Sequence, residues 1–478
     1  MRKEFLSNLS LILLLNFLVK PFYVLGVETQ IQNAVGPSEF GIYSAILSFT
    51  FLLNIILDGG ITNFNTRNIA QHRQLLSKHF GGIVRVRVVL GVLYMGVLIL
   101  LGSFLNYVQE HFWMLFLLGV NQFLVASILY FRSNLAGLHR FKADAFISVL
   151  DRSLLLVFMG ALILLPHVFG EFQIMWLVYG QTLAYGIALI SSFILLRKNL
   201  TQLKLRGNRA FSRMILKKSL PYALLILLSM AYYKTDAVML EQLLGDDGFY
   251  AGIYAMGFRF FEASNMIGFL FAGLLLPIFS RLIKKNESLD SIASSAFQLL
   301  FTGGVLLAGI PWLVGDEILN FFYHDHLDEA LRPFQILMSA FFFVMMSYLF
   351  GTILTARGDL RVMNFLALFG VILNVVLNFS LISKLQAEGS AWASLFTQGM
   401  ISLIQMFLAL KYSKLRFSKR TLISMFVYSC FVGILFYLLT ISSLSWVLKG
   451  GTFVCLGLAG AFLTRFLRMG QFKELLQR

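Results

Sequence analysis

The stretch from Ser219 to Ser280 decides how the chain is interpreted. Its first apolar run, SLPYALLILLSMAYYKTDAVMLEQLLG (219–245), contains Lys234, Asp236 and Glu241. Its second, FYAGIYAMGFRFFEASNMIGFLFAGLLLPIFS (249–280), contains Arg259 and Glu262. A charge near the centre of a bilayer costs about 2.5–3.5 kcal/mol on insertion scales, so such residues usually face a partner or a wet cavity. We therefore predict that these two helices form one wall of a polar cavity inside a helical bundle.

The composition of the whole chain indicates a membrane protein. Hydrophobic residues make up 58% of the 478 residues and charged residues only 13%, and the mean hydropathy is +0.79. A soluble domain carries about 25% charged residues. The ten-residue alternating segments of an outer-membrane barrel are absent from the sequence. The predicted fold class is an all-α polytopic membrane protein.

The apolar runs predict fourteen transmembrane helices, because about 20 residues are needed for each crossing. The run after the N-terminus continues past Lys20 with no small-residue cleavage site, so we expect a retained first helix rather than a signal peptide. The predicted spans are 9–33, 41–62, 83–105, 112–132, 145–166, 172–196, 219–243, 249–279, 292–314, 331–355, 361–383, 388–411, 421–441 and 447–467.

The basic residues predict the orientation. Most of the 39 Lys and Arg fall in loops on one side of these spans, the side that also holds both termini. By the positive-inside rule that side is cytoplasmic. The formal charge of +16 is thereby explained by topology, and no nucleic-acid partner is expected. Four cations fall inside spans: Lys20, Arg152, Lys234 and Arg259.

Two halves of the chain match each other at a nearly constant offset. Gly41-Ile42-Tyr43 recurs as Gly252-Ile253-Tyr254, 211 residues later, and Gly137 matches Gly358, 221 residues later. This predicts two parallel six-helix lobes around a central cavity, residues 1–196 and 219–411, joined by a basic cytoplasmic linker over 197–218. Residues 412–478 add two C-terminal helices and a cytoplasmic tail. Two matched lobes that rock against each other are typical of transporters.

Over nearly its whole length, the chain resembles polysaccharide flippases, of the O-antigen and capsule type, in the multidrug/oligosaccharidyl-lipid/polysaccharide exporter superfamily. The segments that carry the resemblance are VGPSEFGIYSAILSF (35–49), LDGGITNFNTRNIAQH (57–72), SLPYALLILLSMAYYKTDAVML (219–240), LLPIFSR (275–281), VILNVVLNFSLI (371–382) and AEGSAWASLFTQ (387–398). The resemblance implies a multi-pass protein of the bacterial cytoplasmic membrane that is not an enzyme. The implied activity moves a polyprenyl-diphosphate-linked oligosaccharide from the inner to the outer leaflet.

Lys20 and Arg259 are the predicted diphosphate contacts. The related lipid II flippases have basic residues in the first helix and an Arg-x-x-Glu pair in the eighth, and Lys20 and Arg259-Phe-Phe-Glu262 are similar to that pattern. This chain departs from the pattern because its first helix has one cation within the span rather than several. Arginine binds phosphate with a planar fork and lysine with a point charge. The structural alternative is ion pairing of Arg259 with Glu262 and of Lys20 with Glu28.

The remaining candidate residues lie in other predicted spans and loops. The predicted role of Lys234, Asp236 and Glu241 is to line the cavity or to hold the two lobes together. Asn265 is predicted to contact sugar hydroxyls. Arg67 is predicted to contact phosphate at the cytoplasmic entrance of the cavity, or to be present only as a topological signal in a cytoplasmic loop. Asp58 is a helix terminus or an ion site, and Asp151 with Arg152 is assigned to lobe packing. No cofactor or metal is expected, and the coupling ion is H⁺ or Na⁺, with Asp236 or Glu262 as its site.

The alternatives that stay open are a lipid II flippase, a drug/cation antiporter and a membrane glycan polymerase or ligase. A cavity for cationic drugs should be net acidic, whereas the cations inside the spans favour an anion. A polymerase needs a large outward loop, and the longest here is about sixteen residues, 315–330. Expected partners are the lipid-linked oligosaccharide, membrane lipids, and the glycan polymerase and glycosyltransferases that act on the same glycan.

Overall fold

The regular elements of the described chain are all helical. The computed structural model describes residues 19–60, Thr62, Asn65, Ile69, 75–197 and 209–467. The chain divides into two compact units, Met1–Gly252 and Ile253–Arg478. The boundary lies within a helix, α12 (Phe249–Lys284), whose first turn belongs to the first unit. Each unit is described by itself below.

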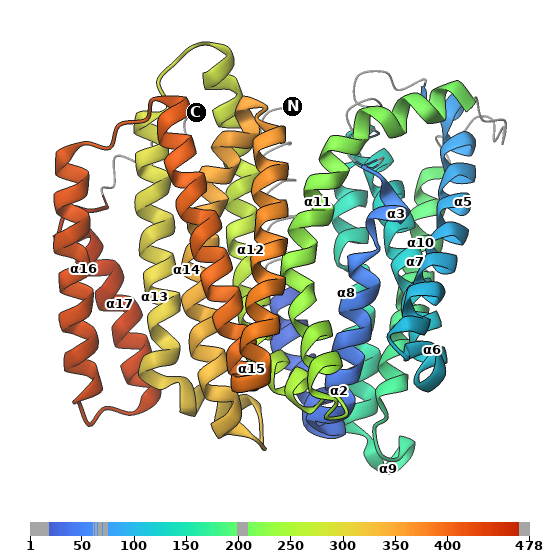
Figure 1. Cartoon of the computed structure of the whole chain (residues 1–478), viewed down its shortest axis with the longest axis horizontal. Helices are drawn as coiled ribbons and strands as arrows, with labels where there is room; N and C mark the ends of the chain where they lie inside the picture. The colour runs from blue at the N-terminus through green and yellow to red at the C-terminus, as the bar shows by residue number, and fades with distance from the viewer. Residues whose placement is uncertain are drawn as a thin grey trace. The chain divides into compact units, whose positions relative to one another are not determined.

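Within its described residues, the first unit contains six long helices and four short ones (Figure 1). They are η1 (Tyr23–Glu28), α2 (Thr29–Leu52), α3 (Ile55–Asp58), α5 (Leu75–Phe104), α6 (Tyr107–Glu110), α7 (Phe112–Gly137), α8 (Phe141–Leu164), α9 (Pro166–Phe169), α10 (Ile174–Arg197) and α11 (Arg209–Leu244). Helix α10 packs on α7 and α8, and α11 packs on α2, α3 and α5. The contacts of α11 place this helix within the first unit. The lobe boundary over 197–218 stays a prediction.

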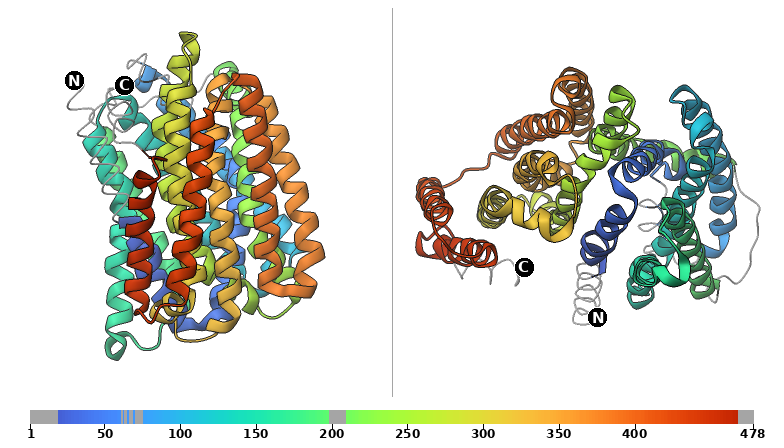
Figure 2. Two further views of the ribbon diagram at one scale, coloured as in Figure 1. Left: turned by 90° about the vertical axis from the view of Figure 1, so that its left-hand side faces the viewer. Right: turned by 90° about the horizontal axis from the view of Figure 1, so that it is seen from below.

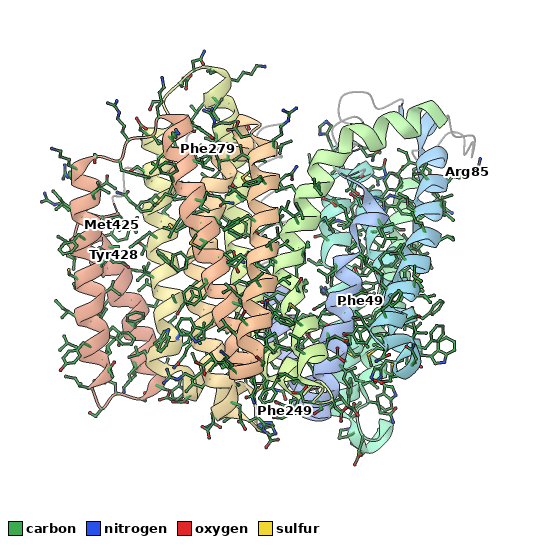
Figure 3. The ribbon with its side chains drawn as sticks, viewed as in Figure 1. Phe49, Arg85, Phe249, Phe279, Met425 and Tyr428 are labelled. Atoms are coloured by element: carbon green, nitrogen blue, oxygen red, sulfur yellow. The ribbon has the colours of Figure 1, made fainter. Side chains whose placement is uncertain are left out.

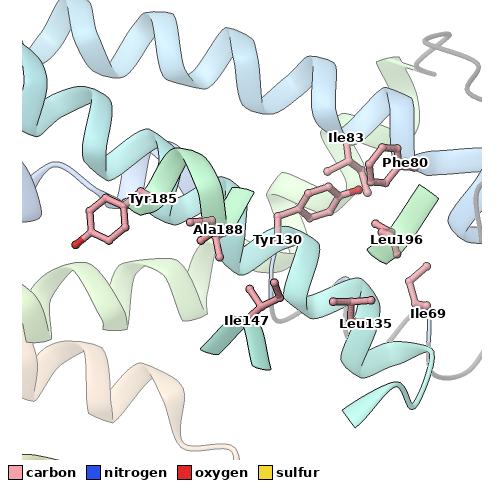
Figure 4. Close-up of a cluster of buried hydrophobic side chains, with 10 residues drawn as sticks. Ile69, Phe80, Ile83, Tyr130, Leu135, Ile147, Tyr185, Ala188 and Leu196 are labelled. Atoms are coloured by element: carbon pink, nitrogen blue, oxygen red, sulfur yellow. The ribbon is translucent and has the colours of Figure 1, made fainter. Parts of the chain in front are cut away.

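A cluster of buried apolar side chains joins α5, α7, α8 and α10 (Figure 4). Tyr130 is its largest fully buried member, and its ring stacks on Phe80 at 5.8 Å between ring centroids. Tyr185 also belongs to the cluster, but Figure 4 shows its hydroxyl pointing away from the other labelled side chains. Tyr185 therefore links the apolar core to polar groups on its far side.

Helix α2 is kinked where its sequence requires it. Gly36 has φ +81° and ψ 169°, a conformation that glycine adopts without a Cβ penalty. Pro37 follows and restarts the helix at a position where no backbone donor is needed. The kink lies between the predicted spans 9–33 and 41–62, so two predicted crossings join into one kinked rod.

The restarted part of α2 touches the first turn of α12 backbone to backbone. A Cβ placed on Gly41 would lie 1.8 Å from the Gly248 carbonyl oxygen, and a Cβ on Gly252 would lie 2.0 Å from that of Pro37. The Gln32 side chain donates to the Gly252 carbonyl oxygen at 2.9 Å. With the repeat offset of 211 residues, Gly41 matches Gly252 and Pro37 matches Gly248, so each contact is the counterpart of the other.

The second unit comprises most of α12 together with α13 (Asp290–Phe322), α14 (Leu327–Arg357), α15 (Leu360–Ser413), α16 (Lys419–Thr440) and α17 (Trp446–Leu463). Helix α14 is its centre and packs against α13 and α15. Gly358 ends α14 in the left-handed conformation with φ +85°, a common C-terminal cap. Helix α15 is two helices joined at Gln386, which lies between the predicted spans 361–383 and 388–411.

The last two helices form a pair that packs on α13 (Figures 1 and 2). Gly457 of α17 lies against Leu306 of α13, and Tyr428 of α16 (labelled in Figure 3) stacks on Phe466 at 5.3 Å between ring centroids. Helices α16 and α17 correspond to the predicted C-terminal addition over 412–478.

This is a multi-pass membrane protein. Eleven helices in the described part of the chain are long and apolar enough to cross a bilayer. Two of them, Val19–Asp58 with 40 residues and Leu360–Ser413 with 54, are each long enough for two crossings. Helix α11 is not among the eleven. The all-helical membrane fold is confirmed, and the number of fourteen crossings stays a prediction.

Candidate functional site

Arg152 is held between two tyrosine rings in the middle of α8. Its guanidinium carbon lies 4.9 Å from the ring centroid of Tyr23 and 6.0 Å from that of Tyr185. Arg152 Nη1 also donates to the Tyr185 hydroxyl at 3.3 Å. A cation over an aromatic face is attracted by the ring quadrupole, more strongly when both groups are desolvated. Contacts of this kind offset the cost of placing a charge within a membrane span.

Tyr23 comes from η1, which is a π-helix. A π-helical turn is rare and is frequently found at functional sites, because the extra residue per turn redirects the side chains around it. Tyr23 is fully buried. Among the described residues, its hydroxyl has no hydrogen-bond partner.

Lys20 lies just before η1 and shares its surroundings with Arg152. The charges that act most strongly on Lys20 are those of Arg152 and Arg132, ahead of the charge of Asp151. Arg132 is paired with Asp144, with 2.7 Å between Nε and Oδ1. Glu28, at the other end of η1, acts on Tyr23, Tyr43 and Arg152. The first unit thus brings the predicted residues Lys20 and Glu28 together with Arg152.

A buried hydrogen bond lies beside this cluster. Gln181 Nε2 of α10 donates to the Tyr43 hydroxyl of α2 at 2.6 Å. Both side chains are buried, and Tyr43 also packs edge-on against Phe40. A buried polar pair of this kind is stable because each group finds its partner inside the protein. It fixes α2 against α10, the helix that carries Tyr185.

The predicted site residues Lys234, Asp236 and Glu241 all lie on α11 in the first unit. Lys234 Nζ lies 5.5 Å from the ring centroid of Phe51 on α2. Asp236 is 1% exposed. Glu241 accepts a hydrogen bond from the hydroxyl of Tyr107 at 2.6 Å. Burial, followed by the charge of Glu241, raises the pKa of Tyr107 well above its ordinary value, so this phenol stays a donor.

Asp58 ends α3 and forms an ion pair with Arg87 of α5. Arg87 is 4% exposed, and it also donates to the Ala126 carbonyl oxygen at 2.7 Å and to Thr62 Oγ1 at 2.9 Å. Its guanidinium lies over the Tyr130 ring at 4.9 Å. Gly59 follows Asp58 in the left-handed conformation. Asp58 is therefore both a helix terminus and one half of a buried charge pair. Arg67 lies outside the described residues.

Arg259, Glu262 and Asn265 all lie on α12 in the second unit. Arg259 is 3% exposed and Glu262 lies one turn further on, partly buried. The Tyr348 hydroxyl of α14 donates to Asn265 Oδ1 at 2.8 Å. Phe260 and Phe261, which follow Arg259 directly, pack on Phe334 and Phe341 of α14. This packing fixes the position of α12 on α14 and, with it, the position of the Arg259 side chain.

Sequence reasoning assigned Arg152 to lobe packing and did not include it among the substrate contacts. Its place among the four cations within spans was a signal, but the adjacent Asp151 suggested a local structural charge. The tyrosines that hold it come from η1 and α10, 129 residues earlier and 33 later in the chain. Their convergence is a property of the packed helices.

The chain matches known proteins over most of its length. The model of the family described as polysaccharide biosynthesis protein matches residues 5–283, more than half of the chain. An uncharacterized membrane protein of Methanocaldococcus jannaschii, MJ1375, is 23% identical over 396 residues, which cover 80% of this chain and 92% of that protein.

Solved structures of transporters have the same fold. The lipid II flippase MurJ, in an inward closed conformation, is similar with a TM-score of 0.68 and 13% identity, covering 95% of this chain and 99% of that one. An inward-facing multidrug resistance transporter of the MATE family in the MOP superfamily is similar with a TM-score of 0.66 and 12% identity, covering 82% of this chain and 94% of that one. A MOP superfamily transporter from Pyrococcus furiosus is similar with a TM-score of 0.60 and 13% identity, covering 85% of this chain and 95% of that one. Because its model matches residues 5–283, more than half of the chain, the chain belongs to the family described as polysaccharide biosynthesis protein.

Proposed function

We propose that this protein moves a polyprenyl-diphosphate-linked oligosaccharide from the inner to the outer leaflet of the bacterial cytoplasmic membrane. The observation that carries the proposal is a set of cations inside helices that cross the bilayer. Lys20 and Arg152 lie together in the first unit, and Arg259 is buried on α12 in the second. Intramembrane charges are expensive and mark substrate pathways. Their sign favours an anionic headgroup.

The chemistry of these residues is matched to a diphosphate. A guanidinium group binds phosphate oxygens through two parallel hydrogen bonds, and an ammonium group adds a point charge. Together they replace the hydration that the diphosphate loses on leaving water. The oligosaccharide and the headgroup travel through the protein while the polyprenyl tail stays in the bilayer.

We assign alternating access as the mechanism, with the headgroup exposed to one side of the membrane and then to the other. An inside-negative potential favours outward movement of an anion by about 2.3 kcal/mol per charge per 100 mV. Exchange for H⁺ or Na⁺ through Asp236 or Glu262 adds further drive. A net outward transfer of negative charge should therefore respond to the potential in sealed vesicles.

The lipid II flippase among the similar structures suggests the second candidate substrate, which carries the same diphosphate on a different glycan. The cation set does not distinguish the two. A drug/cation antiporter is disfavoured, because its substrate has the same sign of charge as Lys20, Arg152 and Arg259.

The test is a flipping assay in proteoliposomes with a fluorescent lipid-linked oligosaccharide. Arg259→Ala should slow flipping by about tenfold or more, because a charge-assisted contact is worth about 1.5–3 kcal/mol and each 1.4 kcal/mol is tenfold. The matched control is Arg361→Ala, which removes an exposed cation from α15 of the same unit and should flip like wild type. Flipping by Arg259→Ala at the wild-type rate would refute the assignment of Arg259. A wild-type protein that flips no diphosphate-linked glycan would refute the function.

A further inference from the structure

Arg152 is a cation in the middle of a membrane span that the resemblance does not assign to any role. It is half-buried on α8, and its guanidinium carbon lies over the ring of Tyr23, 4.9 Å from the ring centroid. A guanidinium group has five N–H donors, so a contact with an aromatic ring leaves donors for a further acceptor. One edge nitrogen, Nη1, donates to the Tyr185 hydroxyl at 3.3 Å.

The neighbouring groups also point to an anionic ligand. Lys20 lies three residues before Tyr23 in one helical segment, so the two side chains share a face. Arg152 and Arg132 place positive charge near Lys20, and an anion between Lys20 and Arg152 would relieve this repulsion. Arg132 is already paired with Asp144. Asp151 acts on both Lys20 and Arg152, and Glu28 acts on Arg152.

The Tyr23 hydroxyl supplies an independent observation. Tyr23 is fully buried, and no described group of the protein accepts or donates a hydrogen bond at this oxygen. A buried hydroxyl without a partner costs about 1–3 kcal/mol. A phosphate oxygen at the Arg152 edge would accept from this hydroxyl. The π-helical turn that presents Tyr23 is itself a feature that is enriched at functional sites.

We infer that Arg152, with Lys20 and the Tyr23 hydroxyl, forms a diphosphate-binding subsite in the first unit. This inference rests on the proposed function and names the residues that would hold the headgroup there. The tyrosine rings orient the guanidinium, and the edge of the guanidinium binds two oxygens. The site should therefore favour a diphosphate over a monophosphate.

The experiment measures dissociation constants of polyprenyl diphosphate, polyprenyl monophosphate and free polyprenol for the purified full-length protein by native mass spectrometry. Arg152→Gln should weaken binding of the diphosphate at least tenfold. Arg152→Lys keeps the positive charge but removes the planar guanidinium group. It should lower the preference for diphosphate over monophosphate about fivefold or more. Tyr23→Phe keeps the ring over Arg152 and removes only the hydroxyl, and should weaken diphosphate binding about threefold or more.

The matched control is Arg85→Gln, which removes an exposed cation from α5 in the same unit (Figure 3) and should bind as wild type does. If Arg152→Gln fails to insert, Arg152→Lys and Tyr23→Phe decide the question, since both keep the packing. A wild-type protein that binds polyprenol as tightly as the diphosphate would overturn the proposed function. A wild-type preference for the diphosphate that survives in Arg152→Lys and Tyr23→Phe would overturn this inference alone.

Discussion

At the scale of single residues, cations inside the helices are held by different contacts. Arg152 stacks on tyrosine, Lys234 lies over the Phe51 ring, and Arg87 is paired with Asp58 and hydrogen-bonded to the Ala126 carbonyl oxygen. The paired cation is fixed in one place by several acceptors. Arg87 also lies over the Tyr130 ring, so a ring contact alone does not distinguish the two roles. What differs is the carboxylate of Asp58, which fixes Arg87 within the protein.

The Asp58–Arg87 pair should stabilise the first unit strongly. Breaking a buried ion pair by removing one partner typically costs about 3–5 kcal/mol, because the other charge is left uncompensated. Asp58→Asn leaves Arg87, 4% exposed, without its carboxylate, whereas Arg87→Gln leaves Asp58, 26% exposed and still hydrogen-bonded to Thr62. We expect Asp58→Asn to lower the apparent Tm more than Arg87→Gln, as measured by thermal unfolding in detergent.

The double variant Asp58→Asn/Arg87→Gln is the control. It should lose less stability than the sum of the two single variants, because neither charge is left alone. Additive losses would show that the pair does not couple.

At the scale of elements, the contact between α2 and the first turn of α12 depends on glycines, which have no side chain to keep the two backbones apart. The two rods approach so closely that Gly41 and Gly252 each face backbone of the other segment. Gly248, with φ +80°, adds a position that other residues rarely adopt. The matched glycines of the two predicted repeats therefore meet where the two helices begin.

Gly41→Ala should force this contact apart. Its Cβ would lie 1.8 Å from the Gly248 carbonyl oxygen, which is backbone and cannot rotate away. We expect a loss of at least about 1–3 kcal/mol, seen as a lower apparent Tm. Gly252→Ala should behave alike, since its Cβ would lie 2.0 Å from the Pro37 carbonyl oxygen.

Gly96→Ala is the matched control for this prediction. Gly96 lies inside α5 with no atom within 4 Å of its Cβ position, so alanine there should be neutral or stabilise by up to about 1 kcal/mol. Equal stability of Gly41→Ala and Gly96→Ala would contradict the close contact.

At the scale of the whole molecule, the distribution of charge among the loops predicts which side of the membrane each loop faces. The loop around Ser288 lies next to basic residues and is predicted to be cytoplasmic, whereas the loop around Ser443 is predicted to face outward. Both serines are exposed. The two native cysteines are Cys430 and Cys455.

Labelling by a membrane-impermeant maleimide tests this orientation. In a Cys430→Ser/Cys455→Ser background, Ser443→Cys should be labelled in intact spheroplasts, and Ser288→Cys only after the membrane is permeabilised. The background without either new cysteine is the control. The reverse pattern would invert the predicted orientation and, with it, the direction of transport.

Much of the fold was predictable because its signals are local or regularly repeated. A membrane span needs only about 20 consecutive apolar residues, and a break in a helix can be recognised from one or two residues, such as Gly36-Pro37. Predicted spans therefore correspond to observed helices from α5 to α17. The motif Gly41-Ile42-Tyr43 and its copy could be aligned by offset alone, but their mutual contact could not, because contact depends on how the segments cross.

The sequence by itself determined the membrane class, the helical fold and the family resemblance, since these follow from composition, length and motif order. Only the tertiary structure decided which charges are neighbours: Arg152 with Tyr23, Tyr185 and Lys20, Arg87 with Asp58, and Glu241 with Tyr107. The physical reason is the distance along the chain over which each effect can be recognised. Hydropathy acts over a single helix, whereas a charge within the bilayer is compensated by whatever side chains distant helices place a few ångströms away.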